Sequence, residues 1–132
     1  MKIPPTENRS RRYDHILVDA DNTILDFRVC ERRILESIAR DFGFMPRTKN
    51  GEDLVSAYRR INTALWRRLE QGTISGDTLK VERFRRLSEL LDYTAISRPV
   101  PPQRLNEEFI RRLRTCGELV PTTPAVLSAI GP

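Results

Sequence analysis

The fold and the chemistry of this chain are decided by one stretch, Tyr13-Asp14-His15-Ile16-Leu17-Val18-Asp19-Ala20-Asp21-Asn22-Thr23-Ile24-Leu25-Asp26-Phe27. Its apolar residues 16–18 predict a strand that is buried on both faces, as in a parallel sheet. The strand runs directly into Asp19 and Asp21, two carboxylates that are separated by one residue. Because ligands of open α/β sheets bind at the carboxyl ends of strands, these acids lie where a functional site is expected.

The composition is that of an ordinary globular domain. The 132 residues are 39% hydrophobic and 31% charged, which is enough for one domain with its own core. No apolar run is long enough to span a bilayer, and no signal-peptide pattern opens the sequence. We therefore expect a cytoplasmic protein that has no membrane partner.

The net charge of +5 raises the question of nucleic-acid binding. Residues 1–12 hold four basic side chains and one acid, a net +3, which leaves +2 for the rest of the chain. We interpret residues 1–12 as a flexible basic tail. The helical segments mix Arg with Asp and Glu, as solvated faces do, so nucleic acid is not an expected partner.

Apolar residues at helical spacing predict four consecutive helices after the strand. No second convincing strand is found, so a buried strand that needs neighbours stands alone. Four amphipathic helices with short connections can close as a bundle. The predicted helices are 28–42, ended by Gly43; 50–71, capped by Asn50; 75–91, capped by Ser75; 103–116; and a short segment 125–130.

Two simpler interpretations of the acids are a calcium-binding loop and a plain polar turn. A calcium-binding loop would use Asp19, Asp21 and Thr23, but the glycine and the glutamate that it also requires are Ile24 and Cys30 here. That interpretation is excluded. A plain polar turn after a strand stays open, whereas the apolar residues on both sides of the acids favour a catalytic site.

The sequence from Val18 to Leu25, placed after a hydrophobic strand, resembles the first motif of the haloacid-dehalogenase-like (HAD-like) hydrolases, which are mostly phosphatases. The helical region resembles the cap of the branch related to the pyrimidine and non-canonical nucleotide 5'-nucleotidases. The residues that carry this second resemblance are Tyr58, Ile61, Asn62, Leu65, Trp66, Gly72, Thr73, Ile74, Leu79, Arg83 and Phe84.

The resemblance covers residues 13–130 and implies an α/β, Rossmann-like core in the parent family. This chain would be mainly α, with one N-terminal core strand and a four-helix cap bundle. Residues 13–27 would form the first strand and the catalytic turn, 28–117 the helical cap, and 118–132 the return to the core.

By the same resemblance, Asp19 is the nucleophile that takes the phosphoryl group and Asp21 is the general acid and base. Mg²⁺ is the implied cofactor, with the Asp19 carboxylate and the Asp21 backbone carbonyl as ligands, and Thr23 supports the turn. The implied substrate is a small phosphorylated metabolite such as a nucleoside monophosphate. The implied function is a nucleotidase-like phosphatase that works through an aspartyl-phosphate intermediate.

The family's later motifs are a Ser or Thr, a Lys and an acidic pair, and the sequence ends before the strands that carry them. Lys49 and Lys80 fall in a linker and in the third predicted helix, where neither is a credible catalytic lysine. We therefore expect a truncated and inactive chain. The alternative from another class is a non-enzymatic helical interaction module with a basic tail.

Three cap side chains are candidates for substrate contact, and each has a structural alternative. Trp66 would otherwise pack between cap helices, which we favour because buried aromatics usually serve packing. Asn62 would otherwise be solvated or bonded to its own helix. Arg83 would otherwise pair with Glu82 or Glu89, which we also favour.

The two cysteines, Cys30 and Cys116, form neither a disulfide framework nor a metal-ligand cluster, so reduced thiols are expected. They begin and end the cap, where the resemblance places the two chain crossings close together. A disulfide between them is the alternative.

Overall fold

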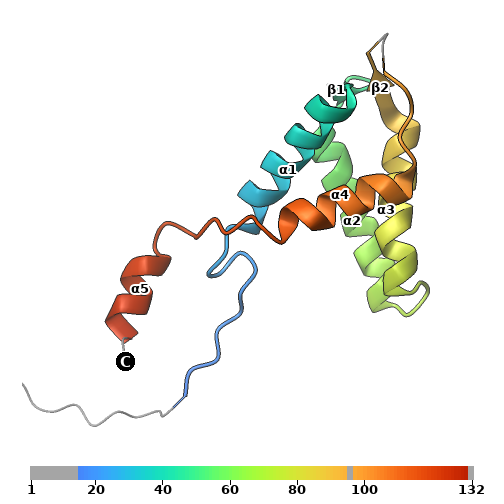
Figure 1. Cartoon of the computed structure of the whole chain (residues 1–132). Coiled ribbons are helices and arrows are strands. Elements are labelled where there is room, and N and C mark those ends of the chain that lie inside the picture. Colours follow the sequence, from blue (N-terminus) through green and yellow to red (C-terminus); the bar gives the residue numbers. More distant parts are fainter. Residues whose placement is uncertain (1–14, 95–96, 131–132) are drawn as a thin grey trace, which may run out of the picture.

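The computed structural model describes residues 15–94 and 97–130, which form five helices and one small antiparallel sheet (Figure 1). Helices α1 to α4 pack together, whereas α5 lies apart from them (Figure 1). The predicted basic tail at residues 1–12 lies outside the described residues. In chain order the elements are α1 (Phe27–Phe42), β1 (Phe44–Thr48), α2 (Leu54–Glu70), α3 (Gly76–Leu90), β2 (Leu91–Tyr93), α4 (Pro102–Leu113) and α5 (Thr123–Ile130).

Local capping sets the helix ends. Gly43 adopts a left-handed φ of 72° and ends α1, and the Ser75 side chain accepts the Thr78 amide at the start of α3, so both predicted caps are confirmed. The predicted Asn50 cap of α2 is wrong, because Asp53 takes that place and accepts the Ser56 amide at 3.0 Å.

The core of the helical bundle is centred on three aromatic rings from three different helices. Tyr58 of α2, Phe84 of α3 and Phe109 of α4 are each 1% exposed, and their ring centroids lie 5.5 to 5.6 Å apart. Aromatic pairs at this distance add to the stabilisation that burial provides. The apolar faces predicted for these helices therefore meet at one point.

Arginine side chains join α1 to its neighbours. The Arg59 Nε on α2 donates to the buried Glu31 of α1 at 2.6 Å. Arg112 on α4 donates to the Ser37 hydroxyl at 2.6 Å and pairs with Asp41 at 2.8 Å. A buried carboxylate such as Glu31 is tolerated only when it is paired in this way.

The small sheet was not predicted. Strands β1 and β2 are antiparallel, with Phe44 opposite Tyr93 and Thr48 opposite Leu91. The Phe44 and Tyr93 rings meet edge to face, with centroids 5.9 Å apart. The linker predicted at residues 44–50 is therefore wrong, because it contains β1. The third predicted helix ends at Leu90, next to the expected Leu91, whose backbone is already extended.

The predicted N-terminal core strand is also not formed among the described residues. Residues 15–20 are irregular, and Ile16, Leu17 and Val18 are all exposed. No described strand lies beside them, so their backbone amides and carbonyls have no ladder of partners. A buried strand cannot form without such neighbours.

None of the helices in the described parts of the chain combines the length and the apolar character that crossing a membrane would need.

Candidate functional site

The two acids lie on a turn that is closed by backbone hydrogen bonds. The Ala20 carbonyl accepts the amides of Ile24 at 3.0 Å and Leu25 at 2.9 Å, and the Asn22 amide donates to the Leu25 carbonyl at 2.8 Å. Asn22 has a φ of 59°, a left-handed conformation that asparagine tolerates better than most residues. Main-chain bonds therefore close residues 20–25, and Asp19 directly precedes them. We call residues 19–25 the acidic turn.

The side chains of the acidic turn point to solvent. Asp19, Asp21 and Thr23 are all exposed, and no described residue forms a hydrogen bond with any of the three side chains. Asp21 also lines a cavity of about 180 Å³ together with Phe27 and Cys30 at the start of α1. The support of the turn by Thr23 stays a prediction.

The turn offers oxygen atoms that suit Mg²⁺. The Asp19 carboxylate is free, and the backbone bonds of the turn use the carbonyls of Ala20 and Leu25 and leave that of Asp21 without a described donor. Hard cations such as Mg²⁺ bind oxygen ligands of this kind. The fit is partial, because in the part of the chain that the structure describes no three His, Cys, Asp or Glu side chains gather as a metal-ligand set.

A short antiparallel ribbon connects the acidic turn to the bundle. Residues 24–26 lie beside residues 118–120, with Leu25 opposite Leu119, and we call this pair of segments the base ribbon. An ion pair between Arg33 and Glu118 lies next to it. Two backbone hydrogen bonds hold the base ribbon, from the Asp26 amide to the Glu118 carbonyl at 2.8 Å and from the Val120 amide to the Ile24 carbonyl at 2.9 Å.

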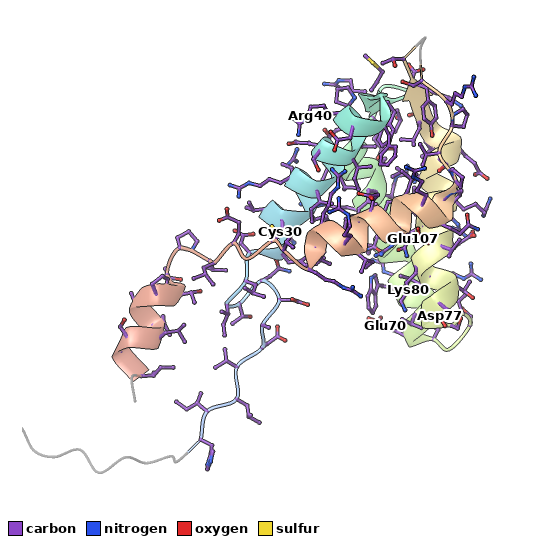
Figure 2. All side chains as sticks on the ribbon, in the orientation of Figure 1. Cys30, Arg40, Glu70, Asp77, Lys80 and Glu107 are labelled. Carbon is purple, nitrogen blue, oxygen red and sulfur yellow. A yellow bond between two sulfur atoms is a disulfide. The ribbon has the colours of Figure 1, made fainter. Side chains whose placement is uncertain are left out.

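A disulfide joins Cys30 and Cys116 next to the base ribbon, so the expectation of two reduced thiols is wrong (Figure 2 labels Cys30). The α carbons of the two cysteines lie 5.9 Å apart, although they are separated by 86 positions in the sequence. The chain enters the bundle at the start of α1 and leaves it after α4, and these two points lie close enough to bring the cysteines together. The alternative of a disulfide, which the resemblance suggests, is therefore confirmed.

Beyond the base ribbon, α5 packs loosely against the acidic turn. The buried Thr123 hydroxyl donates to the Ile24 carbonyl at 3.1 Å. Sequence reasoning missed Thr123, and no local pattern signals a contact between positions so far apart. An apolar groove of about 160 Å³ lies between the two segments, lined by Val18, Thr23, Ile24, Thr122, Thr123, Val126, Leu127 and Ile130.

Arg83 lies in the centre of the bundle and does not form the ion pair that we favoured. It is 7% exposed, donates to the Asn106 side-chain oxygen at 2.9 Å, and places its guanidinium 5.0 Å from the centroid of the Phe109 ring. The neighbouring Glu82 pairs instead with Arg85 and Arg86, whose hydrogen bonds lower the pKa of that carboxyl to about 2.

The other two cap candidates differ from expectation as well. Trp66 is 48% exposed, so the favoured packing role between helices is wrong. The Asn62 side-chain oxygen is buried and has no hydrogen-bond partner among the described residues. No described hydrogen bond joins Asn62, Trp66 or Arg83 to the acidic turn, and none of the three lines the cavity beside Asp21.

Comparisons with known proteins agree with the resemblance seen in the sequence. No protein-family model matches the chain. YfnB of Bacillus subtilis (strain 168), which is provisionally named a HAD-hydrolase, is 35% identical over 85 residues, or 64% of this chain and 34% of YfnB. A crystal structure of YfnB, described as bound to magnesium and as revealing interdomain movement, matches 83% of this chain and 44% of its own with a TM-score of 0.67 and 25% identity.

The chain thus spans well under two thirds of the length of the relative that it matches, with 34% covered in sequence and 44% in structure. The predicted HAD-like fold class is confirmed, and so is the mainly helical character of this chain. Over the part that it covers, the chain is similar in both sequence and fold to the HAD-hydrolase YfnB.

Proposed function

We propose that this chain carries the nucleophile and the cap of a Mg²⁺-dependent phosphoric monoester hydrolase. The observation that carries the proposal is the acidic turn itself, with Asp21 exposed on a backbone-closed loop at the base of the helical bundle and Asp19 exposed directly before it. The relationship to a HAD-hydrolase supports a hydrolase, and its magnesium-bound crystal structure supports the choice of cation.

In this mechanism the Asp19 carboxylate attacks the phosphorus atom and the bond to the leaving alcohol breaks, which leaves an aspartyl-phosphate. Asp21 gives its proton to the leaving oxygen and then accepts one from the water that hydrolyses the intermediate. When bound, Mg²⁺ would screen the repulsion between carboxylate and phosphate. The Asp19 carboxylate and the Asp21 backbone carbonyl would be the ligands of the Mg²⁺ ion.

We further propose that the residues present here do not complete the catalytic site. The Lys49 amide bonds to the Leu90 carbonyl beyond the far end of α1, a 16-residue helix that spans about 24 Å. Lys80 pairs with Asp77 at 3.0 Å on α3. The described cavity beside Asp21 has no basic side chain in its lining, so nothing there neutralises the charge on a bound phosphate.

The proposed substrate is a small phosphorylated metabolite, in the first place a nucleoside monophosphate. Trp66 supports this choice because an indole that is 48% exposed can stack on a base. Asn62 supports it less, because its side-chain oxygen is buried, although it has no described partner. Arg83 is a weaker candidate, because its guanidinium is already bonded to Asn106 within the bundle.

A chimera tests this proposal. Residues 15–130 of this chain would replace the matching part of YfnB, and the hydrolysis of p-nitrophenyl phosphate would be followed with and without Mg²⁺. We expect Mg²⁺-dependent turnover that Asp19→Asn lowers by at least about a thousandfold. A panel of nucleoside monophosphates and sugar phosphates would then rank the substrates.

Asp77→Asn is the matched control, since the Asp77 side chain is 93% exposed on α3 and lies outside the acidic turn. It should leave turnover unchanged. A chimera that folds by circular dichroism but hydrolyses no phosphate ester would contradict the proposal. Turnover that survives Asp19→Asn would do so as well.

A further inference from the structure

The link between the helical bundle and the acidic turn is narrow. Besides the main chain that runs from the turn into α1, it includes the base ribbon with its two backbone hydrogen bonds, the ion pair between Arg33 and Glu118, and the disulfide between Cys30 and Cys116. The side chains of the ion pair are 60% and 41% exposed, so the pair is weak. The disulfide is the covalent cross-link between described residues at this base.

The disulfide lies next to both segments through which the chain passes between the acidic turn and the bundle. We call these segments, residues 24–26 and 118–120, the two crossings. Cys30 lies in the first turn of α1, directly after the crossing at residues 24–26, and Cys116 follows the end of α4 and precedes the crossing at residues 118–120. Opening this bond would free the ends of both crossings at once. The aromatic centre of the bundle, on α2, α3 and α4, would keep its contacts.

A reagent can reach the disulfide from one side. Cys30 is 3% exposed, whereas Cys116 is only partly buried. Both sulfur-bearing residues line the cavity of about 180 Å³ that Asp21 also lines, together with Leu25 and Leu113. Opening or closing the disulfide would therefore change the lining of the cavity next to Asp21.

We propose that Cys30 and Cys116 form a reversible thiol–disulfide exchange site that clamps the base ribbon. A thiolate of a dithiol reductant attacks the accessible Cys116 sulfur, the bond between the two cysteines breaks, and Cys30 leaves as a thiolate that takes up a proton. The second thiol of the reductant then releases Cys116 as a thiol. The reductant ends as a disulfide, and two electrons and two protons have moved to the cysteines.

Oxidation would hold the acidic turn at a set position beneath the bundle, and reduction would let it move. This inference is independent of the proposed function, because it concerns the geometry of the base ribbon and needs no turnover. Its test therefore uses the chain alone and no substrate.

The test is native-state hydrogen exchange of single amides before and after dithiothreitol. The Asp26 and Val120 amides of the base ribbon are expected to exchange at least about tenfold faster after reduction, because local opening no longer works against the disulfide. The Lys49 and Thr94 amides, which donate to Leu90 and Gly43 at the β1 and β2 end of the bundle, should keep their rates.

Variants separate the clamp from simpler effects. Cys30→Ser with Cys116→Ser should match the reduced protein at both ribbon amides. Arg33→Gln removes the exposed ion pair but keeps the disulfide, and it should change the ribbon rates less than about twofold.

Four results would overturn the proposal. They are two free thiols in the unreduced protein by Ellman titration, a disulfide that dithiothreitol does not open in the folded protein, ribbon rates unchanged by reduction, and equal acceleration of the ribbon and reference amides. The last result would show general stabilisation in place of a local clamp.

Discussion

The helical bundle and the acidic turn stand side by side in one chain, yet they bury their apolar side chains very differently. In α1 to α4, apolar residues at helical spacing meet in one core around three aromatic rings. In residues 15–25 and in α5, the large apolar side chains are mostly exposed. The bundle therefore carries its own source of stability, whereas the segment with the candidate chemistry does not.

The same difference appears in the polar groups. Within the bundle, the Glu31 and Arg83 side chains each have a hydrogen-bond partner from another helix, although the buried Arg83 Nε and Asn62 oxygen have none among the described residues. In the acidic turn, Asp19 and Asp21 have none among the described residues. A helical cap can fold on local and inter-helix contacts, but a catalytic turn needs groups from other segments around it.

The largest expected effect comes from truncating matched leucines in the two regions. Leu105 is 1% exposed and Leu17 is 100% exposed. Leu105→Ala should lower the free energy of unfolding by about 2–5 kcal/mol, because it removes buried methyl groups and leaves a cavity. Leu17→Ala should change it by less than about 0.5 kcal/mol. Urea denaturation followed by circular dichroism measures both, and equal losses would refute the contrast.

A smaller effect is expected at the end of α1. Gly43→Ala should cost about 1–2 kcal/mol, because Gly43 has a φ of 72° and a Cβ there would collide with the Ser97 hydroxyl. Gly76→Ala is the control, since Gly76 lies in α3 with open space around it and has no positive φ. We expect Gly76→Ala to be neutral or slightly stabilising in the same denaturation assay. A destabilisation of Gly76→Ala as large as that of Gly43→Ala would contradict the conformational explanation.

The smallest effect concerns pH. Hydrogen bonds from Arg85 and Arg86 lower the pKa of Glu82 to about 2 from an ordinary 4.5. A lowered carboxyl pKa contributes stability that is complete above pH 4.5 and is lost as the pH falls towards 2. Because the arginines are partly solvated, Glu82→Gln should cost only about 1 kcal/mol at pH 7.

Denaturation of wild type and Glu82→Gln at a series of pH values checks this expectation. The difference between the two proteins should shrink below pH 4.5. Glu70→Gln serves as the control, because Glu70 is exposed and has no ion-pair partner among the described residues (Figure 2). A constant difference across the pH series would show that the charge of Glu82 does not matter.

The sequence predicted the helices well because their signals are local. Gly43 and Ser75 end and start helices through bonds to residues three or four positions away, which a sequence pattern can reveal. The prediction of Asn50 as the cap of α2 was wrong because Asp53, another residue type that caps helices well, lies three positions later and takes that place. In the structure Asn50 instead bonds to the Thr48 hydroxyl within the turn.

Features that depend on distant partners were not predicted. Strands β1 and β2 are short, one contains Pro46, and their pairing joins positions more than forty residues apart, so neither shows a strand pattern of its own. The expected strand at residues 16–18 has the right composition, but no described strand pairs with it. Composition alone does not form a strand.

The sequence identified residues of the candidate site, but it did not predict which side chains and segments lie around them. Asp19 and Asp21 lie on a turn, as their spacing after an apolar run implied, and their catalytic roles stay predictions. The environments predicted for Trp66 and Arg83 were wrong, because they depend on which helices pack against each other. The pairing of Cys30 with Cys116 depends in the same way on how the chain returns to its starting point.

The most direct test of the central claim is an assay of this chain by itself with p-nitrophenyl phosphate and Mg²⁺. Since the acidic turn is exposed and no group among the described residues lies there to hold and neutralise a phosphate, we predict no turnover above the blank. Wild type and Asp19→Asn should then behave alike, while both keep the far-ultraviolet circular dichroism of a folded helical bundle. Mg²⁺-dependent turnover that disappears in Asp19→Asn would contradict the claim, because it would show that these residues already form a complete site.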